Sequence, residues 1–269
     1  MKKFDCFCAT DFVFGGYMAK GKAWTRGELI LAINLYCKIP FGKIDMRTPE
    51  VIQLAQRLDR TAGSISYKLA NFASIDSTLP RKGASNVSRL DIEVWQEFFD
   101  NWDDLAFESE KKAAEIQNVP LDKFAGIDTG NLPIGETKER AVKTRVNQQF
   151  FRKMILSTYD YRCCITGLPI EELLIASHII PWSKDKKNRL NPSNGLCLNA
   201  LHDRAFDKGL ISFSDQYEIL ISKRIDKSEP EKVDFFLRYN KQKIDLPKRF
   251  LPNKNFLAYH RNNIFKAEI

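Results

Sequence analysis

Two of the three histidines in this chain, His178 and His202, lie in one short window that also holds Asn194, Asp203 and Asp207. A neutral imidazole can take up a proton near pH 7. Asp203 and Asp207 are four residues apart, so on a helix they share one face, and carboxylate oxygens suit a hard divalent cation such as Mg²⁺. This window therefore indicates proton transfer beside a bound metal ion.

Each of these residues also has an ordinary structural explanation. His178 follows and precedes apolar residues, so it could be a core histidine. Asn194 precedes Gly195 and could form a turn. His202 and Asp203 stand near a helix start, where they could cap the helix or complement its dipole. The combination of all of them, in this order, favours a functional site.

Four sequence blocks occur in order within residues 145–222: Cys164–Gly167, Ser177–Trp182, Asn191–Leu196 and Leu201–Asp207. With these blocks the sequence resembles the HNH (ββα-metal) endonucleases, in the branch of predicted restriction endonucleases. The resemblance implies an α+β fold, with a helical N-terminal domain followed by a ββα-metal (HNH) nuclease domain. It also implies hydrolysis of phosphodiester bonds with Mg²⁺ or Mn²⁺.

The resemblance assigns a role to most residues of the window. His178 is expected to be the general base that takes a proton from water, and Asn194 to brace the loop and orient His178. The helix ligand of the family commonly lies nine residues after the central Asn, which is Asp203, and Asp207 lies one turn further. His202 falls at eight residues, so it stays open as a catalytic residue or as a metal ligand.

Serine and cysteine positions limit the metal chemistry. Ser177 stands where the wider family often has Asp or His. This removes a common metal ligand, so we expect the helix to supply the ligands. The six cysteines include no Cys-x-x-Cys pair, so we expect no structural zinc site. Cys164 and Cys197 are expected to pack under the small sheet, and reduced thiols are expected throughout.

The excess of positive charge lies in the second half of the chain. Residues 1–130 hold 17 basic and 18 acidic residues, whereas residues 131–269 hold 25 and 16, which places a net charge of +9 in the second half. This asymmetry predicts a polyanionic partner, for which double-stranded DNA is the simplest choice. The side chains expected to contact DNA are Arg145, Arg152, Lys184, Lys186, Lys187 and Arg189.

The first half of the chain predicts helices. Helical periodicity covers residues 22–38, 48–58 and 90–107, and a further helix begins after Thr61. The helices on either side of Thr61 resemble a helix-turn-helix that would expose Ser64, Ser66, Tyr67, Lys68 and Asn71. A plain helical hairpin is the alternative, because this half carries no excess of positive charge.

Glycine and proline at positions 126–135 indicate a linker. We therefore predict a helical domain at 1–108, a linker at 109–136 and the nuclease domain at 137–269. The nuclease domain should begin with a basic helix, and two short strands, a loop and a helix should then position the site. A β-rich segment is expected at 210–222.

The chain has 43% hydrophobic residues but no apolar run that could span a membrane, and its first thirty residues lack a secretory pattern. We expect a cytoplasmic, metal-dependent DNA endonuclease of the restriction type that could act as a homodimer. A DNA-binding regulator with an inactive nuclease remnant and an RNA-directed nuclease are the alternatives.

Overall fold

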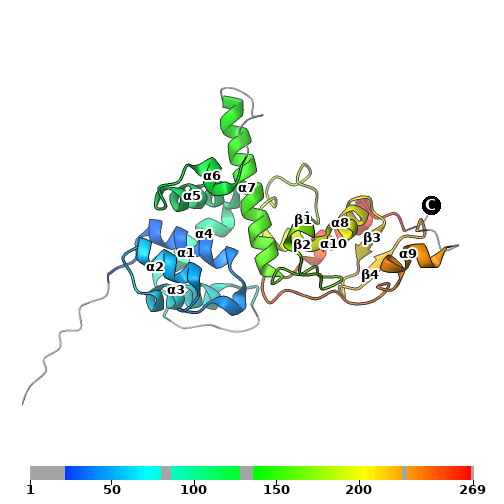
Figure 1. Cartoon of the computed structure of the whole chain (residues 1–269), viewed down its shortest axis with the longest axis horizontal. Coiled ribbons are helices and arrows are strands. Elements are labelled where there is room, and N and C mark those ends of the chain that lie inside the picture. Colours follow the sequence, from blue (N-terminus) through cyan, green and yellow to red (C-terminus); the bar gives the residue numbers. More distant parts are fainter. Residues whose placement is uncertain (1–21, 80–85, 128–135, 226–228, 268–269) are drawn as a thin grey trace, which may run out of the picture.

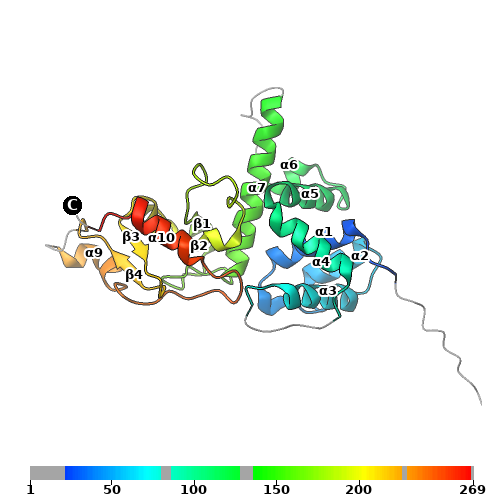
Figure 2. The ribbon, with the colours of Figure 1, turned by 180° about the vertical axis from the view of Figure 1, so that it is seen from behind.

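The computed structural model describes residues 22–79, 86–127, 136–225 and 229–267, so Cys6 and Cys8 lie outside it. A helical part and a smaller part with two hairpins lie on opposite sides of the long helix α7 (Glu136–Thr158), as Figures 1 and 2 show. This order of elements confirms the predicted α+β fold with a helical N-terminal region. None of the described helices is long and apolar enough to cross a membrane.

The helical part is built around its first helix, which packs against the next four helices of this part and against α7. Thr25 begins this helix through a capping box with Glu28. The third helix begins after Thr61, whose hydroxyl accepts a hydrogen bond from the Ser64 amide (3.1 Å). The elements are α1 (Arg26–Lys38), η1 (Phe41–Lys43), α2 (Pro49–Arg57), α3 (Ala62–Ile75), α4 (Arg89–Asp100), α5 (Trp102–Glu115) and α6 (Leu121–Ala125).

The acidic segment 90–107, predicted as one helix, forms α4 and part of α5. Asn101 interrupts the helix with φ −135° and ψ 62°, and its side-chain amide donates to Asp104 Oδ2 at 2.9 Å. α5 continues to Glu115 and α6 follows, so residues 109–115 and 121–125 of the predicted linker are helical. Residues 128–135 lie outside the described part of the chain, and the division into domains stays a prediction.

The outward face expected for α3 is partly covered by α4. Lys68 Nζ lies 2.8 Å from both carboxylate oxygens of Asp91, in a buried ion pair, and Asn71 donates to the Asn86 carbonyl at 3.0 Å. Tyr67 is 49% exposed. The prediction that Lys68 and Asn71 face solvent is wrong, because the first turn of α4 packs against this side of α3.

α7 contributes to the packing of both parts. In the helical part its Phe150 lies 6.3 Å from Phe98 between ring centroids, and the Ser157 hydroxyl donates to the Cys37 carbonyl at 2.9 Å. Its other side faces the first hairpin through Phe151. One continuous cluster of buried apolar side chains therefore extends from α1 to α10.

The smaller part contains the predicted strands, loop and helix. β1 and β2 pair antiparallel, with His178 opposite Gly195, and β3 and β4 form a second hairpin where the β-rich segment was expected. Cys164 and Cys197 are buried free thiols, as predicted; Cys197 lies in β2, and its carbonyl accepts from the Cys164 amide at 2.8 Å. The elements are η2 (Glu171–Leu173), β1 (Leu174–His178), η3 (Pro192–Asn194), β2 (Gly195–Asn199), α8 (Ala200–Asp207), β3 (Ile211–Phe213), β4 (Ile219–Ile221), α9 (Pro230–Leu237) and α10 (Lys254–Asn263).

The chain before α10 returns to the helical part and attaches there through a buried arginine. Arg249 is fully buried and donates to the carbonyls of Tyr36, Cys37 and Ile39 at the carboxyl end of α1. A cation is favourable there because the carbonyls that end a helix carry partial negative charge. The carboxyl end of α1 is thus tied to residues near the end of the chain.

Candidate active site

His178 is the last residue of β1, and its half-buried ring lies between two aromatic side chains. The ring stacks on Phe151 of α7 with centroids 4.0 Å apart and planes 12° apart, and the Trp182 ring meets it edge-on at 5.5 Å. Burial lowers the pKa of His178, and a hydrogen bond to the Arg189 backbone opposes the shift. The imidazole is therefore neutral at pH 7, which is the form that a general base needs.

The same hydrogen bond determines which ring nitrogen of His178 is available. Nε2 lies 2.9 Å from the Arg189 carbonyl oxygen, which can only accept, so Nε2 carries the ring proton. Nδ1 of the neutral ring then keeps its lone pair. A cavity of about 200 Å³ adjoins the ring and is also lined by Gln148 and Arg152. Nδ1 is thus the ring nitrogen of His178 that can accept a proton.

Asn194 is fully buried and holds the chain that follows His178. Its Oδ1 accepts from the Ile180 amide at 2.8 Å, and its Nδ2 donates to the carbonyls of Ile180 (3.2 Å) and Asn188 (3.1 Å). Its own carbonyl accepts from the Ile179 amide at 2.9 Å. These bonds fix the start of the loop against the start of β2, which is the arrangement that a bracing residue requires.

Gly195 allows α7 to approach the hairpin directly opposite His178. A Cβ atom at this position would lie 2.3 Å from Ile155 Cδ1 and 2.9 Å from Phe151 Cζ. The φ of this glycine is −126°, so its backbone is extended and does not form a left-handed turn. The Asn-Gly pair therefore ends η3 and starts β2, and the glycine serves close packing.

Asp203 of α8 approaches the other face of β1, and Asp207 lies one turn further along the helix, where it is exposed. Asp203 lies beside the Ser177 hydroxyl, whose buried Oγ makes no hydrogen bond of normal geometry within the described residues. Burial raises the pKa of Asp203 and of Asp207; the charge of Asp207 raises that of Asp203 further, and Ser177 opposes it. Because neighbouring strand residues point to opposite faces, Ser177 faces α8 while His178 faces α7.

This set of oxygen donors fits a hard divalent cation. The Ser177 hydroxyl has no hydrogen-bond partner of normal geometry among the described residues, and the two carboxylates disfavour each other's negative charge. A cation bound between these groups would stabilise all of them. In the described part of the chain, no three His, Cys, Asp or Glu side chains form a metal cluster. The protein would therefore hold the ion through Asp203 and Asp207 beside Ser177, and Mg²⁺ commonly keeps water or phosphate as its other ligands.

His202 faces α9 and lies under two aromatic rings. The rings of Phe236 and Tyr239 meet it edge-on at 5.3 Å and 5.8 Å, and burial lowers its pKa. Its Nδ1 lies 3.1 Å from Oδ1 of Asn199, the N-cap of α8. Its buried Nε2 has no hydrogen-bond partner of normal geometry within the described residues, so metal binding by His202 stays a prediction.

The loop at 181–193 is basic outside and internally hydrogen-bonded. Asp185 Oδ1 accepts from the amides of Lys187 (3.0 Å) and Asn188 (3.1 Å), and Arg189 Nε donates to the Trp182 carbonyl at 2.8 Å. The guanidinium of Arg189 also lies over the Trp182 ring at 5.1 Å. Three lysines of this loop are exposed, namely Lys184, Lys186 and Lys187.

The basic residues of α7 interact within the protein. Arg152 Nη1 donates to the Leu174 carbonyl at 2.7 Å and so attaches α7 to the start of β1. Lys143 pairs with Asp103 of α5 at 3.0 Å, and Arg145 is half-buried and also has an interaction partner. DNA contacts by Arg145 and Arg152 stay predictions.

The role of α7 as a wall of this site was not part of the sequence analysis. Gln148, Phe151 and Arg152 share one helix face and border the cavity beside His178. Their spacing of three and four residues is visible in the sequence. Nothing local to α7, however, indicates that this face meets the end of β1.

Comparison with known proteins gives one match in this region. Residues 163–214 match the family described as HNH endonuclease, and this range contains β1, the basic loop, β2 and α8. No curated protein matches the chain. An HNH endonuclease domain implies a phosphodiester hydrolase with a nucleic-acid substrate, and such nucleases generally use a divalent metal.

Proposed function

We propose, from the HNH endonuclease domain at residues 163–214, that this protein is a metal-dependent DNA endonuclease of a restriction system that acts in the cytoplasm. The observation that supports it most is the state of His178: a neutral ring, with Nε2 held by the Arg189 carbonyl and Nδ1 free. The carboxylates of Asp203 and Asp207 lie on the helix at the other face of the same strand.

In this proposal, Nδ1 of His178 takes a proton from a water molecule whose oxygen attacks phosphorus in line with the departing 3′-oxygen. The Arg189 carbonyl holds the ring in place and stabilises the imidazolium that forms, and the face of Phe151 adds a cation–π contribution. Asn194 keeps the loop in position. Mg²⁺, when bound by Asp203 and Asp207, would stabilise the negative charge on the leaving oxygen.

Duplex DNA is the proposed substrate because of the charge distribution. The second half of the chain carries the whole positive excess, and the exposed lysines Lys184, Lys186 and Lys187 lie on the loop that joins His178 to Asn194. Phosphate neutralisation by such groups gives affinity without regard to sequence. DNA bound along this loop would bring a phosphate near the end of β1.

The test uses the full chain with plasmid and phage DNA, modified and unmodified, and with RNA, in Mg²⁺ or in EDTA. We expect DNA cleavage in Mg²⁺, none in EDTA, and a loss of roughly 10²-fold or more in His178→Ala, with DNA affinity nearly unchanged. Thermal unfolding of the variant controls for its fold, and light scattering tests the expected homodimer.

Each other outcome points to a different function. Cleavage by a folded His178→Ala variant at the normal rate would refute the proposed base. DNA binding without cleavage under every condition would indicate a regulator with an inactive nuclease remnant. Cleavage of RNA in place of DNA would indicate an RNA-directed nuclease.

A further inference from the structure

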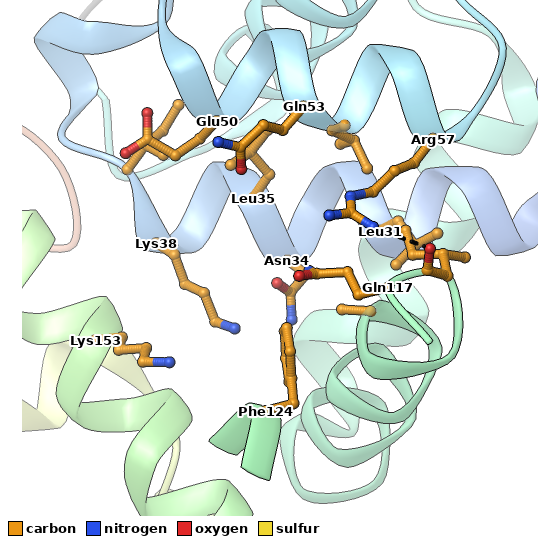
Figure 3. A pocket seen from close by; sticks show the side chains of 14 residues that line it. Leu31, Asn34, Leu35, Lys38, Glu50, Gln53, Arg57, Gln117, Phe124 and Lys153 are labelled. Carbon is orange, nitrogen blue, oxygen red and sulfur yellow. Dashed lines mark hydrogen bonds between the residues drawn. The ribbon is translucent and has the colours of Figure 1, made fainter. Parts of the chain in front are cut away.

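A cavity of about 230 Å³ lies in the helical part, separate from the first hairpin. Side chains of α1, α2, α5, α6 and α7 line it, and Figure 3 shows several polar ends directed into the space. None of its lining residues belongs to the nuclease site described above. The cavity therefore needs its own explanation.

Three cationic side chains line this cavity. Lys38 is only 14% exposed and pairs with the buried Glu110, to which Asn34 also donates at 2.6 Å. Within the described residues, no carboxylate pairs with Lys153 or with Arg57, the other two cations. Burial lowers the pKa of Lys38, Glu110 opposes this, and the positive charge of Lys153 lowers it further. Positive charge thus collects here beyond what the protein neutralises.

One acidic residue, Glu50, also lines the cavity. In Figure 3 the carboxylate of Glu50 lies on the α2 side, while the ammonium groups of Lys38 and Lys153 approach each other on the opposite side. An anion between the two ammonium groups would relieve their repulsion. The charge pattern therefore favours an anionic ligand.

The two ammonium groups lie over the ring of Phe124. The centroid of Phe124 lies 5.7 Å from Lys38 Nζ and 5.9 Å from Lys153 Nζ. The side chain of Gln117 lies near Phe124, and that of Gln53 lies across the cavity on the α2 side, beside Glu50, as Figure 3 shows. A ring face and amide groups can bind a flat heterocycle, and cations can bind a phosphate. The cavity therefore suits a ligand that contains both.

We propose that this cavity binds a 5′-phosphorylated nucleoside, with the phosphate between Lys38 and Lys153 and the base against Phe124. The amides of Gln53 and Gln117 would donate to and accept from the edge of the base. A cavity of about 230 Å³ has the size of a small ligand and not of a duplex. A free mononucleotide and a single nucleotide of a DNA strand present this same chemistry, so the experiment separates them.

The experiment is calorimetry of the full chain in EDTA, which prevents metal-dependent cleavage during the measurement. The probes are the four deoxynucleoside 5′-monophosphates, the matching nucleosides, inorganic phosphate and a short 5′-phosphorylated oligonucleotide. We expect at least one monophosphate to bind tenfold or more tightly than its nucleoside and than phosphate alone, because only it uses both halves of the cavity.

Variants locate the binding. Lys153→Ala and Phe124→Leu should weaken the monophosphate tenfold or more, whereas Lys123→Ala should not, because Lys123 is an exposed cation of the same helix as Phe124 that does not line the cavity. If the oligonucleotide alone binds, and Lys153→Ala removes this binding, the nucleotide comes from a DNA strand and the proposal stands.

Three results would overturn the proposal: no binding of any monophosphate or of the oligonucleotide at millimolar concentration, equal binding by the Lys153→Ala variant, or phosphate alone bound as tightly as the monophosphates. None of these depends on the nuclease assignment, because the His178→Ala variant should bind the monophosphate normally.

Discussion

His178 lies in surroundings that keep its ring neutral, and this has a consequence for the pH dependence of cleavage. Burial lowers its pKa from the ordinary value of 6.5. The unprotonated base then persists to lower pH, so the acidic limb of the kcat/KM profile should fall below pH 6.5. Initial cleavage rates from about pH 4.5 to 8 measure this. A limb at or above pH 6.5 would contradict the buried, neutral ring.

Asp203 and Asp207 should control the metal requirement, and His202 should not. We expect Asp203→Asn and Asp207→Asn to raise the Mg²⁺ concentration needed for half-maximal cleavage by roughly 10-fold or more, with partial rescue by Mn²⁺. His202→Asn should lower the rate without that shift, because its ring lies under α9. Metal titrations of the three variants decide this, and the reverse ranking would make His202 the ligand.

At the scale of elements, the contact between α7 and the first hairpin depends on Gly195. Gly195→Ala should lower the free energy of unfolding by about 1–3 kcal/mol, because the new methyl group overlaps Ile155 and Phe151. Cleavage should slow as well, since the ring of His178 rests on Phe151. Urea unfolding measures the first effect.

A second substitution provides the control for this prediction. Ile155→Val removes Cδ1, the atom nearest to the added methyl group, so the Gly195→Ala, Ile155→Val double variant should lose less stability than the sum of the two single variants. Additive losses would show that Gly195 serves some purpose other than the close approach of α7.

α10 is attached through a buried neutral histidine, which predicts a loss of stability in acid. His260 stacks on Phe206 at 3.7 Å and accepts at Nδ1 from Ser212 Oγ (2.9 Å). Burial lowers its pKa from 6.5 to about 4. Between these values the unfolded chain binds the proton and the folded chain does not, so the free energy of unfolding should fall as pH drops from 6.5 to 4, by at most about 3 kcal/mol.

Urea unfolding at several pH values measures this loss, and His260→Gln is the control. The variant should be less stable at pH 7 but should show a smaller loss between pH 6.5 and 4. The pKa values of His178 and His202 are lowered too, so part of the slope should remain. An unchanged slope would mean that His260 is not held neutral.

On the scale of the whole molecule, the helical and nuclease parts share one core, and Arg249 connects them. Its guanidinium binds three carbonyls at the end of α1 and lies 4.6 Å from the Tyr36 ring centroid. Arg249→Met should lower the free energy of unfolding by roughly 3 kcal/mol, because these buried carbonyls lose charged donors. Arg238→Met, at an exposed arginine just after α9 that pairs with Asp234, should change it by less than about 0.5 kcal/mol.

Denaturant unfolding followed by both tryptophan fluorescence and circular dichroism tests the shared core. We expect a single unfolding transition, and we expect Arg249→Met to lower its midpoint equally in both signals. Two separate transitions, of which the variant moves only one, would show that the two parts fold independently.

Much of the fold and of the site is local in the sequence and could be predicted from it. Helix starts such as the one after Thr61 follow from capping within one turn. His178, Asn194 and Asp203 occur in one window in a recognisable order, and the family match covers this window. Local patterns therefore determined the elements, the HNH domain and the residues to be tested.

The tertiary structure alone decided which side chains meet. The burial of Lys68, the stacking of His178 on Phe151 and the attachment of Arg249 to α1 join residues that are distant along the chain or on different elements. Periodicity shows that a helix has an apolar face but not which element covers it, because that depends on how all the elements pack together. The surroundings that keep His178 neutral and leave Nδ1 free were decided in this way.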